Sequence, residues 1–197
     1  VGERVSDGSR KVKLYTKVID KSLIVTKEPV CEVTNADGTR RSVGLGAGKA
    51  VMYMPPIKDL EAGGRYLCPS RVVKDIRVNG DARLILLRDA ELHVDGGITL
   101  APDATLLVNA ESGSGRVGLL SADGIANSAA GGSLVVDGGQ LSIGNRGICG
   151  ESLSVAVRNG DVKSRATIGG DGSDVRITGG KVSACAEMSG FAIGGAG

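Results

Sequence analysis

The chain has 197 residues and a formal net charge of +2, and its 32 glycines accompany one Phe, three Tyr and no Trp. This near balance of charge favours no strongly charged class of partner, and the glycines lack the three-residue period of collagen. No run of 18 apolar residues occurs, so the sequence predicts no membrane-spanning helix. Small aliphatic residues without aromatic ones fit a narrow core made of stacked layers.

Residues 1–63 are expected to form an N-terminal cap or β appendage that ends in an irregular linker. The first 30 residues are basic, and apolar residues such as Val12, Leu14 and Leu23 are interspersed with charges, which predicts one or two strands. A basic segment also allows nucleic-acid binding. These charges are not interleaved with a series of aromatic residues, so we expect no nucleic-acid partner.

From Gly64 onward, short apolar runs alternate with turn-forming pairs such as Asn79-Gly80 and Pro102-Asp103. The runs predict strands at residues 72–78, 82–87, 91–94, 98–100 and 104–108. The Ser/Gly-rich segment at 111–115 is expected to be a corner loop. Residues 124–132, rich in Ala, Ser and Gly, are expected to form a longer excursion from the strands.

The C-terminal third, residues 133–197, contains three variants of one repeat. Each variant has a first apolar strand, a Gly or Asn-Gly turn, a second apolar strand and an isoleucine. The first strands begin at Leu134, Leu153 and Val175. The second strands contain Leu141 and Ile143 in the first repeat, Val162 in the second, and Val182 and Ala184 in the third. The aligned isoleucines are Ile148, Ile168 and Ile193.

This repeat predicts an all-β fold, a right-handed parallel β-helix or β-solenoid with about three short strands per turn and about six turns. One repeat of about 20 residues cannot bury its apolar face alone, but stacked turns form a continuous core. We expect the solenoid over residues 64–197, with an N-terminal cap. No cap follows Gly197, so we expect either a truncated C-terminal end or an exposed end that self-associates.

The residues of the solenoid also resemble a known type of protein. Gly80–Leu100, Ile168–Ala184 and Phe191–Gly197 are similar, in that order, to Gly-rich parallel β-helix repeat modules on the surfaces of Gram-positive gut bacteria. The resemblance covers about residues 72–197. It implies an extracellular or cell-wall-associated, adhesin-like module. It implies no established enzymatic activity and therefore no functional residues to transfer.

A calcium site is one candidate for bound metal. Residues 169–177, GGDGSDVRI, fit much of the calcium-binding nonapeptide of β-helix repeats, with Asp171 and Asp174 as candidate ligands. Arg176 replaces the apolar residue of that motif, and a single copy supplies too few of the six to eight oxygens that calcium prefers. The alternative is a Gly-rich corner whose aspartates bond turn amides, and we expect no required cofactor.

Polysaccharide cleavage, by a β-helix lyase or glycoside hydrolase, is the alternative function. Acidic residues at turns supply carboxylates, and basic residues supply a base for lyase chemistry; they are Asp89, Glu91, Asp95 and Asp137, and Arg158, Lys163 and Arg165. The only histidine, His93, alternates with Leu92 and Val94 and is therefore expected at the surface. No cluster of acids with a nearby histidine is evident in the sequence.

The four cysteines, Cys31, Cys68, Cys149 and Cys185, lack the Cys-x-x-Cys spacing of a zinc site. Cys149 and Cys185 each follow an expected core position, which favours buried free thiols on neighbouring turns. A disulfide between Cys31 and Cys68 would tie the cap to the solenoid in an oxidising compartment.

We therefore expect a non-catalytic structural or binding module that presents a flat strand ladder to a host or cell-wall glycan. Outward polar positions supply the candidate contact residues: Ser154, Arg176, Lys163 and Lys181.

Overall fold

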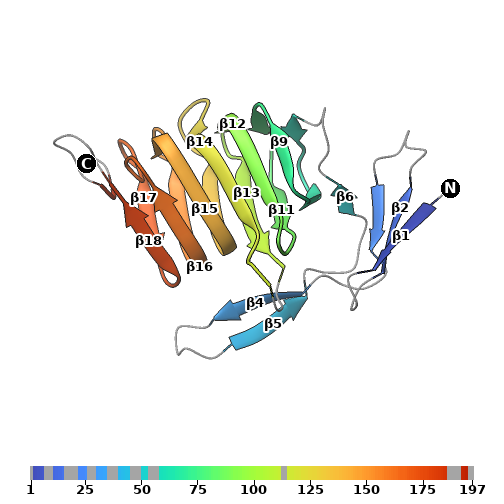
Figure 1. The fold of residues 1–197 in the computed structure, drawn as a ribbon. Coiled ribbons are helices and arrows are strands. Elements are labelled where there is room, and N and C mark those ends of the chain that lie inside the picture. Colours follow the sequence, from blue (N-terminus) through green and yellow to red (C-terminus); the bar gives the residue numbers. More distant parts are fainter. Residues whose placement is uncertain are drawn as a thin grey trace.

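The computed structural model describes residues 2–6, 11–15, 22–25, 30–34, 40–44, 50–52, 58–111, 115–185 and 192–194, with side chains from residue 58 onward. These residues are entirely β-strands, turns and corners, which confirms the predicted all-β class. Parallel strands stack into a β-solenoid of about six turns (Figure 1). Within the described residues, no helix is long and apolar enough to cross a membrane.

Each turn of the solenoid contributes one rung to each of three parallel ladders, which we call the first, second and third faces. The first face contains β8 (Arg65–Cys68), β11 (Ala82–Leu86), β13 (Thr105–Ala110), the start of β15 (Ser133–Cys149), the start of β16 (Ser154–Ser164) and β17 (Asp174–Ile177). The second face contains β9 (Arg71–Val73), the start of β12 (Glu91–Leu100), the start of β14 (Leu119–Asn127), the middle of β15, the end of β16 and β18 (Lys181–Ala184).

The third face begins with β7 (Asp59–Leu60) and β10 (Ile76–Val78) and continues through the ends of β12, β14 and β15. It ends in two single bridges, from Ile148 to Ile168 and from Ile168 to Ile193. The predicted isoleucine column is therefore confirmed, and so is the pairing of Leu141 with Val162 and Val182.

Alternation of side chains explains how these strands make a core. On the first face, Val136, Val157 and Ile177 share one inward column, and each of the first two is 1 % exposed or less. Fully buried leucines and isoleucines fill the same interior from all three faces, including Leu84, Leu100, Leu106, Leu120 and Ile125. Burial of apolar area at about 25 cal/mol per Å² is the main stabilising term of such a stack.

Two expectations about the strands are wrong in detail. Leu134 pairs with Val155, and not with Leu153, which is buried at the corner before β16. Residues 124–127 do not leave the solenoid but form the third-face part of β14, with Ile125 fully buried. Position 124 of this strand is a glycine because a Cβ there would lie 2.5 Å from the Cβ of Arg146.

The N-terminal strands join the solenoid at its first turn. β1 (Gly2–Ser6), β2 (Lys11–Tyr15), β3 (Ser22–Val25) and β6 (Ala50–Met52) pair antiparallel in that order, and β6 pairs in parallel with β8. β4 (Val30–Thr34) and β5 (Arg40–Gly44) form a separate hairpin, and β4 lies against β15. Parallel pairing thus begins at β6 and β7, ahead of the expected boundary at Gly64.

Candidate functional site

The outer side of the first face carries two neighbouring columns of different chemistry. One column is formed by the hydroxyl residues Thr105, Ser133 and Ser154, which pair in register on three consecutive turns. The adjacent column over the same turns is aliphatic and consists of Leu107, Val135 and Ala156. All six residues are half-buried in a flat sheet surface. We call this surface the hydroxyl–aliphatic strip.

A depression of about 440 Å³ opens at the N-terminal end of this strip. Its described lining consists of Gly63, Gly64, Arg65, Asp81, Ala82, Arg83, Thr105 and Leu107. Arg65 and Arg83 occupy the same outward column as Leu107, one rung apart. Neither arginine was predicted from the sequence, because their proximity depends on the exact register of β8 against β11.

A third outward column of the first face is covered. Alternation directs Leu67, Ile85 and Asn109 away from the core, yet each is 3 % exposed or less. The hydroxyl–aliphatic strip is therefore bordered on this side by a column that is covered. Asp137, one of the carboxylates considered for catalysis, lies in this column and accepts a bond at its backbone oxygen from Asn109 Nδ2, at 3.4 Å.

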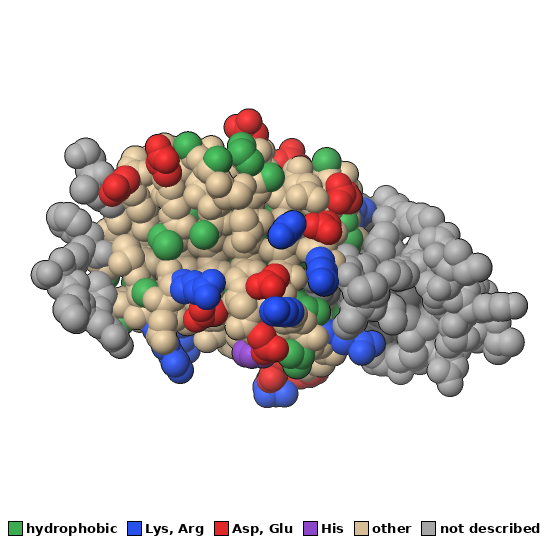
Figure 2. All heavy atoms as spheres, turned by 90° about the horizontal axis from the view of Figure 1, so that it is seen from above, with side chains coloured by type: hydrophobic (Ala, Val, Ile, Leu, Met, Phe, Trp, Pro, Cys, Tyr) green, Lys and Arg blue, Asp and Glu red, His purple; other side chains and the backbone are tan. Residues whose placement is uncertain are grey.

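The outer side of the second face holds the only histidine. His93 is at the surface, as predicted, with its side chain 53 % exposed. One ring nitrogen contacts the hydroxyl of Ser121 on the next turn, and Nε2 lies 3.2 Å from Asp95 Oδ1. Figure 2 shows this purple side chain at the edge of a patch where red and blue side chains adjoin. His93 and Asp95 were candidates from the sequence, but Ser121, which is 28 positions from His93, was not.

Ser121, His93 and Asp95 are the residue types of a nucleophile, a base and an orienting acid. Asp95 is 61 % exposed, and the depression described above lies on another face. His93 and Asp95 are each more than half exposed, so these groups are in contact with water and not in a low-dielectric interior, where such interactions are strongest. The contacts instead bridge two turns of the second face.

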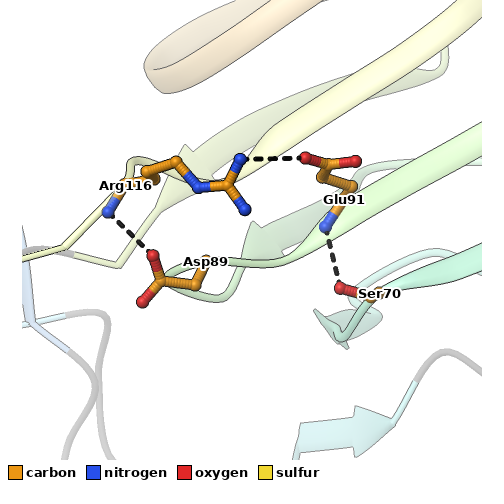
Figure 3. A network of polar contacts seen from close by, with 4 residues as sticks. All are labelled: Ser70, Asp89, Glu91 and Arg116. Carbon is orange, nitrogen blue, oxygen red and sulfur yellow. Dashed lines mark hydrogen bonds and ion pairs between the residues drawn. The ribbon is translucent and has the colours of Figure 1, made fainter.

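A polar network at the corner between the first and second faces ties three turns together (Figure 3). The backbone N–H of Arg116 donates to Asp89 Oδ1 at 2.9 Å. The side chain of Arg116 also forms an ion pair, with Nη1 3.4 Å from Glu91 Oε1. The backbone N–H of Glu91 donates to Ser70 Oγ at 3.1 Å. Asp89 has a positive φ of 58°, so it shapes this corner. Two of the candidate catalytic carboxylates are thus engaged in structural contacts.

The four predicted contact residues divide between two faces. Ser154 and Arg176 lie on the outer side of the first face, in β16 and β17. Lys163 and Lys181 lie on the outer side of the second face, where Lys163 Nζ is 3.7 Å from Asp161 Oδ2. One ligand on a flat surface therefore meets one pair or the other. Only Ser154 belongs to the hydroxyl–aliphatic strip.

The predicted calcium ligands, Asp171 and Asp174, are exposed, in the turn before β17 and at its first position. Ser173 makes the corner bonds there: its Oγ donates to Gly150 O at 2.9 Å and accepts from the N–H of Gly170 at 3.0 Å. Among the described residues, no group of three His, Cys, Asp or Glu side chains is arranged to hold a metal ion.

The cysteines differ in burial from the expectation. Cys68 is a fully buried free thiol, and burial raises its pKa to about 12. Cys149 is half-buried and Cys185 is exposed, so the prediction that both are buried is wrong. The free Cys68 also leaves the bridge to Cys31 unformed, and the side chain of Cys31 lies outside the described residues.

The chain is a parallel β-solenoid whose outer faces carry columns of polar and aliphatic side chains. The chain matches no protein-family model, no curated protein and no solved structure.

Proposed function

We propose that this chain is a non-catalytic binding module whose hydroxyl–aliphatic strip holds a glycan. The observation that carries the proposal is the pairing, over three turns, of the hydroxyl column of Thr105, Ser133 and Ser154 with the aliphatic column beside it. A sugar ring has hydroxyls at its rim and C–H groups on its faces. Hydroxyl side chains both donate and accept hydrogen bonds, and aliphatic side chains pack on C–H groups.

The regular spacing of the strip favours a linear polymer over a single small molecule. Successive rungs of a sheet are about 4.8 Å apart, so equivalent groups recur at a fixed interval along the solenoid axis. Side chains held in a rigid ladder lose little conformational freedom on binding, which offsets the absence of exposed aromatic platforms among the described residues.

The wider setting in this proposal is extracellular or cell-wall-associated, as an adhesin-like module of a Gram-positive bacterial surface protein. Its support is the order of Gly-rich segments over residues 72–197. Self-association through the last described turn is a further part of the proposal, supported by the exposure of Ile177 (45 %) and Ile193 (40 %). Calcium at Asp171 and Asp174 remains an auxiliary proposal, and a melting temperature independent of calcium and chelator would end it.

Retention of the purified protein on a panel of immobilised plant, host and bacterial-wall polysaccharides tests the binding function. We expect retention of the wild type and at least about tenfold weaker binding of a Ser133→Ala/Ser154→Ala variant, since each lost hydrogen bond contributes about 1 kcal/mol. Ser142→Ala/Ser183→Ala is the matched control, because these serines lie on the outer side of the second face. Equal loss in both variants would refute the assignment to the strip.

Cleavage of a polysaccharide is the alternative function, and the same samples distinguish it. Reducing ends report a hydrolase, and unsaturated ends report a lyase. Retention without release of either end supports the binding module, whereas release that requires Asp89, Glu91, Asp95 or Asp137 would replace it with an enzyme.

A further inference from the structure

Strand β17 (Asp174–Ile177) is paired along one edge only in the described part of the chain, where its single partner is β16. The backbone N–H groups of Asp174 and Thr178 donate to carbonyls of the preceding turn, at 3.1 and 2.9 Å. Backbone groups alternate between the two edges of a strand, so those of Val175 and Ile177 point away from β16. Such an edge is a template for pairing with a further strand.

The side chains of β17 alternate between charged and aliphatic. Asp174 and Arg176 are exposed on the outer side of the first face, where they continue the two columns of the hydroxyl–aliphatic strip. Val175 and Ile177 belong to the inward columns, and Ile177 is 45 % exposed. A strand that fits this edge therefore carries apolar side chains inward, and outward it places a positive charge opposite Asp174 and a negative charge opposite Arg176.

A second copy of β17 in antiparallel orientation meets both requirements. With the two Val175 residues opposite each other, Asp174 of each copy lies opposite Arg176 of the other copy. These reciprocal pairs are of the non-hydrogen-bonded type, in which facing Cα atoms are about 4.5 Å apart and opposite charges attract. Either neighbouring register places like charges opposite each other, two Arg176 side chains in one and two Asp174 side chains in the other, and is disfavoured.

The other end of the first face does not offer the same contact. There β8 is already paired with β6, and β6 is paired in turn with β3. The β17 strand of one copy therefore meets no open edge of β8 in another copy. A contact of β17 with its own counterpart is two-fold, and it closes after two copies.

We propose that two copies of this chain associate end to end through β17, as a two-fold dimer held by the reciprocal pairs of Asp174 and Arg176. The inference rests on the self-association that the proposed function includes, and it specifies the partner and the geometry. Pairing of the two β17 strands joins the first faces of both copies into one sheet, so both hydroxyl–aliphatic strips lie on the same side. Two strips on one surface bind a long polymer with greater avidity than one strip alone.

Sedimentation equilibrium of the purified protein over a range of concentrations measures the association. A single short strand edge is a small contact, so we expect a reversible dimer that dissociates on dilution. Arg176→Asp and Asp174→Arg should each weaken this dimer by at least about tenfold, because like charges then face each other in both pairs. An equimolar mixture of the two variants should regain the dimer, since one copy presents two negative charges and the other two positive charges. Arg77→Asp is the control and should leave the dimer unchanged, since Arg77 is exposed on the third face.

The outcomes separate this inference from the function on which it rests. A mixture of the two variants that fails to associate, with both folded by circular dichroism, overturns the pairing of Asp174 with Arg176. An association that grows beyond two copies overturns the two-fold contact and leaves self-association intact. A wild type that is monomeric at every concentration but retained on a polysaccharide overturns the dimer alone. A dimer that no polysaccharide retains supports this inference and overturns the glycan-binding function.

Discussion

The interior turns and the last described turn have the same sequence pattern but very different burial. On the first face, Val157 is 1 % exposed, whereas its partner in β17, Ile177, is 45 % exposed. On the third face, Ile148 and Ile168 are 1 % exposed or less, and Ile193 is 40 % exposed. Figure 1 shows β17 and β18 at one end of the stack, with neighbouring solenoid strands on one side only.

This difference indicates that each turn obtains its burial from its neighbours. A side chain in the interior packs against equivalent side chains above and below, and one at the edge packs on a single side. The free energy of unfolding of such a stack is approximately a sum of terms for each turn and each interface between turns. Two matched pairs of residues allow these terms to be separated.

The first pair is Ile148 and Ile193, which belong to the same inward column. Ile148→Ala should lower the free energy of unfolding by about 2–5 kcal/mol, the usual range for truncating a buried isoleucine. Ile193→Ala should lower it by about 1 kcal/mol or less, because the side chain is 40 % exposed. Urea unfolding followed by circular dichroism measures both. Ile168→Ala is the control and should resemble Ile148→Ala; similar values for all three variants would contradict the comparison.

The second pair is Gly169 and Gly194, which follow successive isoleucines of that column. Both have positive φ, 105° and 99°, so an alanine at either position should cost about 1–3 kcal/mol in backbone strain. A Cβ at Gly169 would also lie 3.0 Å from the carbonyl oxygen of Gly194, whereas a Cβ at Gly194 meets nothing within 4 Å. Gly169→Ala should therefore destabilise by about 1 kcal/mol more than Gly194→Ala. Thermal and urea unfolding give the difference, and a value near zero would show that the contact between turns relaxes without cost.

The alternation of apolar residues was enough to predict the fold, because nearly all inward positions are apolar, with Ser164 as a buried polar exception. Ile148, Ile168 and Ile193 could be aligned from sequence since each precedes a Gly-rich corner. Leu153 was misaligned because an apolar side chain at a corner can also point inward. Residues 124–127 were assigned to a loop because small residues are typical of loops. In the strand, however, Gly124 is required because a Cβ there would clash with the Cβ of Arg146 on the next turn.

The surfaces were less predictable than the core, because outward residues meet across turns of unequal length. Ser121 contacts His93 across 28 positions, and Asn79 contacts Glu61 across 18. The length of each corner sets these separations, and corner length leaves no periodic signal in the sequence. For the same reason, the sequence indicated Ser154 but neither Thr105 and Ser133 beside it nor the pair of Arg65 and Arg83.

The buried thiol of Cys68 and the exposed thiol of Cys185 should also differ in reactivity. At neutral pH, the raised pKa of Cys68 should not affect the free energy of unfolding. In a Cys31→Ser background, Cys185 should react with an aromatic disulfide reagent first, half-buried Cys149 next and Cys68 last, since only the thiolate reacts and burial raises the pKa of Cys68 to about 12.

Below the ordinary value of 9.0, Cys68 is protonated in both the folded and the unfolded protein and makes no pH-dependent contribution. Above that value the unfolded thiol ionises first, so the free energy of unfolding should fall by about 1.4 kcal/mol per pH unit up to the folded pKa. Cys68→Ala should remove this part of the slope, and Cys185→Ala, at an exposed position, should not. A Cys68 that reacts as fast as Cys185 at pH 8 would show that the first turns of the solenoid open as readily as its last.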